Sequence, residues 1–103
     1  MTERFTFNIG PGDRLLWVLE KLEWAASHLE AADAPIHARL ERALLEMVSV
    51  QPADLPHDLR EQLDPLRRAM SEASLTMTTA EAEAVGQAIL RLRVEVQRRI
   101  EAG

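Results

Sequence analysis

Residues 13–32 read DRLLWVLEKLEWAASHLEAA, and this stretch decides the fold of the chain. Its apolar residues recur every three or four positions, which is the spacing of one face of an α-helix. That face consists of Leu15, Val18, Leu19, Leu22, Ala26 and Leu29. Asp13 is a residue type that caps helix starts, and Asp33 with Pro35 breaks the pattern afterwards. The spacing therefore predicts an amphipathic helix over residues 13–32.

The same segment carries a second set of large side chains on the side opposite its leucines. At about 100° per residue, these side chains project roughly half a turn away from the leucine face. They are Trp17, Lys21, Trp24 and His28. One small core covers only one side of a helix, so this second surface needs another contact. Burial within the domain, a subunit interface and a ligand groove are the three alternatives.

Three further segments repeat the helical spacing. Helices are predicted over residues 35–50, 55–74 and 79–101, separated by residues typical of turns. The apolar stripe of the third helix keeps its phase through Pro65. An interior proline removes a hydrogen bond, so we expect either a kink there or two short helices that share one buried face. Residues 78–81, TTAE, fit a capping box at the start of the last helix.

Four helices joined by short breaks predict an all-α fold, a small up-and-down four-helix bundle made of one domain over residues 1–103. Ahead of the first helix, residues 1–12 are predicted to form a short extended arm or strand. Apolar and polar side chains alternate there, which places Phe5, Phe7 and Ile9 on one side. Because the sequence offers no second strand, the arm either pairs with its copy in a dimer or packs on the helices.

Composition limits the classes of function. A length of 103 residues with 47% hydrophobic residues is typical of a globular domain rather than a disordered chain. The absence of cysteine excludes disulfides, thiolate chemistry and cysteine-based zinc sites. The N-terminus lacks the pattern of a secretory leader, and no apolar stretch is long enough to cross a membrane. We therefore expect a cytoplasmic protein without a membrane contact.

The charge of the chain disfavours nucleic acid as a partner. Seventeen acidic and twelve basic residues give a net charge of −5, which repels phosphate backbones unless basic side chains gather on one face. The last helix concentrates such residues at Arg91, Arg93, Arg98 and Arg99. Glu95, however, stands at i,i+4 spacing from Arg91 and Arg99, which favours local ion pairs. A dimeric DNA-associated regulator remains an alternative function.

Two His–Glu pairs have the i,i+4 spacing that can direct a nitrogen and a carboxylate toward one metal ion. They are His37 with Glu41 and His57 with Glu61. Both pairs lie outside the leucine stripes of their helices, so solvated side chains are the favoured interpretation. A metal-binding bundle or an enzyme built on these four residues is the other alternative. No nucleophile motif or phosphate-binding loop accompanies them, so we predict neither catalytic residues nor a cofactor.

The sequence therefore favours a protein-interaction module. A domain of this size is modestly stable alone and gains stability from association, which favours a homodimer. Its acidic charge suits an adaptor, regulatory or inhibitor role toward a more basic protein. The last helix adds a second, smaller apolar ridge beside its main stripe. The predicted interface combines residues of the arm, the first helix and this ridge: Phe5, Phe7, Ile9, Trp17, Lys21, Trp24, His28, Leu90 and Val94.

Overall fold

The computed structural model describes residues 11–72 and 76–102, and every regular element in these ranges is helical. The predicted all-α fold class is thereby confirmed. The elements, in chain order, are α1 Pro11–Glu30, α2 Ile36–Met47, the 3-10 helices η2 Pro52–Asp54 and η3 His57–Leu63, α3 Asp64–Ser71 and α4 Thr79–Ala102.

The N-terminal part of the prediction needs one correction. The extended arm was expected to reach residue 12, but α1 begins at Pro11. Proline suits the first position of a helix, because its missing N–H has no partner there and its φ angle is already helical. Phe5, Phe7 and Ile9, with the rest of the predicted arm, lie outside the described residues.

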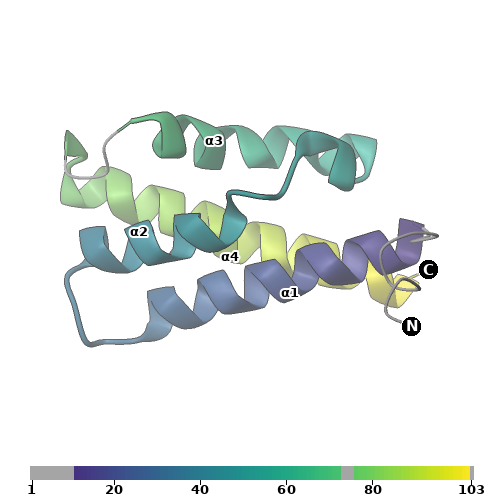
Figure 1. Ribbon diagram of the computed structural model, residues 1–103, viewed down its shortest axis with the longest axis horizontal. Helices are drawn as coiled ribbons and strands as arrows, with labels where there is room; N and C mark the ends of the chain where they lie inside the picture. Colours follow the sequence, from purple (N-terminus) through teal and green to yellow (C-terminus); the bar gives the residue numbers. More distant parts are fainter. Residues whose placement is uncertain (1–10, 73–75, 103) are drawn as a thin grey trace, which may run out of the picture.

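Successive elements of the bundle run in opposite directions (Figure 1). In that view α1 and the η3–α3 segment run from right to left, and α2 and α4 run from left to right. Helix α1 packs on both α2 and α4, whereas α3 and η3 pack on α4. The order is the predicted up-and-down arrangement, and it surrounds α1 with neighbours on two sides.

The core is formed by aliphatic side chains from all four helices and η3. The largest fully buried side chains are Val18, Leu22, Leu40, Met47, Val50, Leu63, Leu66, Ile89, Leu92 and Val96. Among the described residues, no polar or charged residue is buried. These buried residues therefore stabilise the fold by packing, and the side-chain oxygen of Gln62 on η3 is enclosed without a hydrogen-bond partner in the described part of the chain.

The predicted third helix over residues 55–74 is instead two short helices, η3 and α3. Residues 57–63 wind as a 3-10 helix, and α3 begins only at Asp64. Pro65 explains the tighter winding, because in an α-helix its ring would collide with the carbonyl of Glu61. That carbonyl accepts a hydrogen bond from the Asp64 N–H, which is the 3-10 pattern. Both helices share one buried face, the second of the two forms expected at Pro65.

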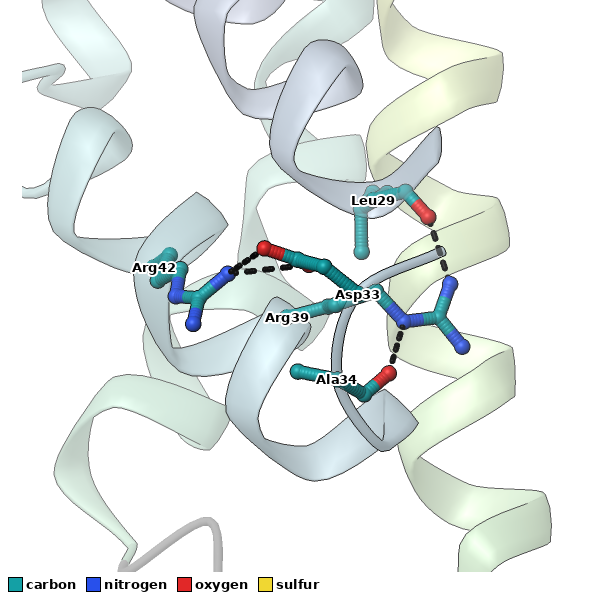
Figure 2. Close-up of polar contacts among 5 residues, drawn as sticks. All are labelled: Leu29, Asp33, Ala34, Arg39 and Arg42. Carbon is teal, nitrogen blue, oxygen red and sulfur yellow. Dashed lines mark hydrogen bonds and ion pairs between the residues drawn. The ribbon is translucent and has the colours of Figure 1, made fainter. Parts of the chain in front are cut away.

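Hydrogen bonds from Arg39 stabilise the turn between α1 and α2 (Figure 2). Its Nη1 donates to the Leu29 carbonyl oxygen at 2.6 Å, and its Nε donates to the Ala34 carbonyl oxygen at 2.8 Å. Arg42 pairs with Asp33 at 3.2 Å on the outside of the same turn. Arg39 thus satisfies a carbonyl in the last turn of α1 that has no partner within the helix.

The predicted capping box at the start of α4 is confirmed. The backbone N–H of Glu81 donates to the Thr78 hydroxyl at 3.0 Å, and the backbone N–H of Thr78 donates to the Glu81 carboxylate at 2.8 Å. Within residues 11–72 and 76–102, no helix combines the length and the apolar character needed to span a bilayer.

Candidate interaction surfaces

The two tryptophans of α1 differ in their surroundings. Trp17 is half-buried and packs partly against the core. Its ring is flanked by two cations, with the guanidinium carbon of Arg14 5.9 Å and the ammonium of Lys21 5.8 Å from the ring centroid. Trp24 is 56% exposed. The protein therefore covers most of one indole with its own side chains and presents the other to solvent.

The predicted interface divides over two flanks of α1. On the tryptophan side, His28 Nε2 lies 3.0 Å from Glu46 of α2, so this side borders α2. The flank of α1 toward α4 carries a different ion pair, Glu23 with Arg93 at 3.8 Å. Leu90 and Val94 belong to α4, and Leu90 shares a hollow with Leu29 of α1.

Leu90 and Val94 also differ from each other. Leu90 is half-buried, packs against the core and lines a shallow hollow together with Leu29 and Gly86. Val94 is 41% exposed. The smaller apolar ridge predicted on the last helix is therefore partly used by the fold, and only its C-terminal end faces solvent.

A third apolar surface lies between α2 and α3, where the sequence analysis placed none. Leu45 of α2 and Val48, the residue that follows α2, are 68% and 60% exposed, the highest values among the large hydrophobic side chains of the described residues. Beside them is a groove of about 230 Å³. It is lined by Glu41, Leu44, Leu45, Val48, Ala69, Met70 and Glu72. We call this surface the α2–α3 groove.

The groove continues past Met70 toward the start of α3. A second hollow shares Val48 and Met70 with the first and is also lined by Gln51, Arg67 and Ser71. One signal for it was present in the sequence, since Leu45 is an apolar residue outside the three- and four-residue repeat of Leu40, Ala43 and Met47. Periodicity could not show that α3 stops short of covering this side.

The two His–Glu pairs are not brought together. His37 at the start of α2 donates from Nε2 to the Met77 carbonyl oxygen at 2.8 Å, just ahead of α4. His57 begins η3, and its neighbour Asp58 pairs with Arg99 near the other end of α4. Over residues 11–72 and 76–102, no cluster of three or more His, Cys, Asp or Glu residues could hold a metal ion.

The remaining two members of these pairs have different positions. Glu41 lines the α2–α3 groove, and Glu61 is exposed on η3. The placement of the four residues therefore gives no geometric support to a shared metal or catalytic site.

Three of the four C-terminal arginines have acidic partners. Arg93 pairs with Glu23, Arg98 pairs with Glu95 at 3.7 Å, and Arg99 donates to Asp58 at 3.1 Å. The hydrogen bond from Arg99 holds the pKa of the Asp58 carboxyl below its ordinary value. These pairs balance the positive charge locally, so α4 does not display an unopposed basic stripe of the kind that nucleic acid binding uses.

Comparisons of the chain with protein-family models, with curated proteins and with solved structures find no match. The basis for assigning a function is therefore the set of exposed surfaces on this bundle. Two of them display strongly exposed large apolar side chains next to charged groups. One is the tryptophan surface of α1, formed by Trp17 and Trp24, and the other is the α2–α3 groove.

Proposed function

We propose that this chain is a protein-interaction module that forms a homodimer and binds another protein in an adaptor, regulatory or inhibitor role. The observation that carries the proposal is the division of its exposed apolar side chains into separate surfaces. Trp24 stands on α1, whereas Leu45 and Val48 stand on the side of α2 toward α3. Apolar side chains displayed in this way are typical of protein contact sites, and two such surfaces allow two contacts at once.

Charge indicates the kind of protein that the module binds. The chain has a net charge of −5, and the exposed Glu20 lies one helical turn before Trp24 on α1. We expect the partner to offer an apolar pocket for this indole, with basic side chains around it. Opposite charges of this kind raise association rates and exclude acidic competitors more than they raise affinity.

Sedimentation velocity over a range of protein concentrations tests the homodimer. The monomer has a mass of 11.6 kDa, and we expect a shift toward twice that mass as the concentration rises. A single 11.6-kDa species at every concentration would contradict self-association.

Affinity capture with a matched pair of variants tests the second contact. The chain and its Trp24→Ala variant are immobilised at equal density, and proteins retained by the chain are purified and measured for direct binding. We expect at least one protein whose affinity falls about tenfold or more on removal of the indole, the size of effect found at interface hot spots. Equal affinity for the chain and the variant would remove the tryptophan surface from the proposal. Leu16→Ala, which shortens another exposed apolar side chain of α1, is the control.

A further inference from the structure

The α2–α3 groove combines a protruding part and a hollow in the same small area. Leu45 and Val48 project from α2, and the adjoining hollow is floored by Leu44, Ala69 and Met70. Its volume of about 230 Å³ exceeds the roughly 150 Å³ of an engineered cavity that takes up benzene. The hollow therefore has room for an aliphatic side chain of the size of Leu45.

The acidic and the basic residues around the groove lie in different parts of it. Helices α2 and α3 run in opposite directions (Figure 1). Glu41, midway along α2, and Glu72, just after α3, both line the first hollow. Arg67, midway along α3, lines the second hollow instead and donates to the side-chain oxygen of Gln51 at 3.4 Å. Within the described part of the chain, neither glutamate side chain has a hydrogen-bond or ion-pair partner. Each end of the groove thus carries side chains that can accept an opposite charge.

A half-turn exchanges the two ends of the groove when its axis crosses the middle of the groove at right angles to the groove's length. In a two-fold dimer the same patch contacts itself, so residue i of one copy meets residue j of the other and the reverse contact also forms. Such a rotation places Glu41 and Glu72 of one copy over Arg67 of the other, at both ends of the contact. The groove is therefore complementary to itself in charge, and Leu45 supplies an exposed apolar side chain beside its hollow.

We propose that the α2–α3 groove is the two-fold interface of the homodimer, with a second copy of this chain as its occupant. The Leu45 side chain of each copy enters the hollow of the other, and Arg67 of each pairs with Glu41 or Glu72 of the other. This inference rests on the proposed function, because it names the surface through which the module associates with itself. It leaves the tryptophan surface free for another protein, since Trp17 is already flanked by Arg14 and Lys21.

Complementary charge reversals test the interface with the intact chain. One variant carries Arg67→Glu and the other carries Glu41→Arg with Glu72→Arg. Each makes both ends of its own groove alike in charge, so we expect each to dimerise about tenfold more weakly than the unchanged chain. Mixed together, the two variants have opposite charges at both contacts. We expect their mixture to form a heterodimer at concentrations where each alone is monomeric, measured by sedimentation velocity.

A second variant tests the apolar part, and controls separate loss of contact from loss of fold. Leu45→Glu places a charge in the hollow of the partner, and we expect the dimer to weaken about a hundredfold. At a concentration where the unchanged chain is monomeric, circular dichroism and the thermal midpoint should stay unchanged, because Leu45 is exposed in the monomer. Trp24→Ala and Glu20→Arg, both at exposed positions of α1, should leave dimerisation unchanged.

The outcomes distinguish the inference from the proposed function. A dimer that resists Leu45→Glu and the charge reversals, or one that is abolished by Trp24→Ala instead, overturns the groove as the interface and leaves the homodimer standing. A chain that is monomeric at every concentration overturns both. Heterodimer formation by the complementary variants supports both.

Discussion

Helix α2 packs on α1 along one flank, whereas an open groove separates its other flank from α3, and the two flanks are built differently. Toward α1, Arg39 holds two carbonyls of the preceding turn and Glu46 pairs with His28. Toward α3, Leu45 and Val48 stay exposed beside an open groove. A chain of 103 residues thus covers one flank of this helix with its own side chains and leaves the other open to solvent.

Truncating a side chain on the closed side should have the largest effect on stability. Leu22 of α1 is fully buried, so Leu22→Ala should lower the free energy of unfolding by about 2–5 kcal/mol. Leu45→Ala, on the open side, should change it by about 0.5 kcal/mol or less. Urea denaturation of both variants, at a concentration where the chain is monomeric, measures the difference. Equal losses would mean that the monomer packs around Leu45 after all.

The arginine at the closed junction should matter more than its exposed neighbour. Arg39→Ala removes two hydrogen bonds and leaves two part-buried carbonyls without donors, which should cost about 2 kcal/mol of unfolding free energy. Arg42 forms an exposed ion pair with Asp33, so Arg42→Ala should cost less than about 1 kcal/mol. Thermal unfolding of the two variants gives the ranking. A larger loss for Arg42→Ala would mean that the ion pair with Asp33 stabilises the turn more than Arg39 does.

Gly86, where α4 passes close to α1, offers a smaller effect of opposite sign. A Cβ added there would lie 3.5 Å from Cδ2 of Leu29, an ordinary contact distance. Alanine also favours a helix interior over glycine, so Gly86→Ala should stabilise the protein by about 0.5–1 kcal/mol. Ala84→Gly, at an exposed position of the same helix, should lower stability by a similar amount. A destabilised Gly86→Ala would show that α1 and α4 cannot accommodate a methyl group.

The exposed pair between η3 and α4 should have the smallest effect, visible through its pH dependence. Because Arg99 lowers the folded-state pKa of Asp58 below its ordinary value of 3.8, the pair stabilises the fold above that pH. The contribution should disappear as the pH falls through the lowered pKa. Thermal midpoints of the chain and of Asp58→Asn should therefore converge on acidification, and added salt should reduce their difference at neutral pH. A constant difference across the acidic range would exclude this linkage.

Periodicity predicted the closed parts of the molecule well. The predicted apolar face of α1 is buried except at Leu19, which is half-buried, because a three- and four-residue repeat determines which side of a helix meets the core. The capping box at Thr78 and Glu81 was also readable, since its two hydrogen bonds are local in sequence. Both features depend on residues within a few positions of each other.

The exposed surfaces were harder to predict, because they depend on how separate helices lie relative to one another. The exposure of Leu45 depends on the open groove between α2 and α3, and the difference between Trp17 and Trp24 depends on which indole packs against the core. The 3-10 winding of residues 57–63 follows from Pro65, whose position indicated a break but not which helical form precedes it. The candidate surfaces were therefore only partly predictable.

The 3-10 winding of η3 also lengthens the segment formed by η3 and α3. A 3-10 helix rises about 2.0 Å per residue, against about 1.5 Å in an α-helix. The seven residues His57–Leu63 therefore extend about 14 Å instead of about 10.5 Å. That gain lets a short segment keep Asp58 at Arg99 while Met70 stays across from Val48. The 3-10 winding thus covers with seven residues a length for which an α-helix would need more residues.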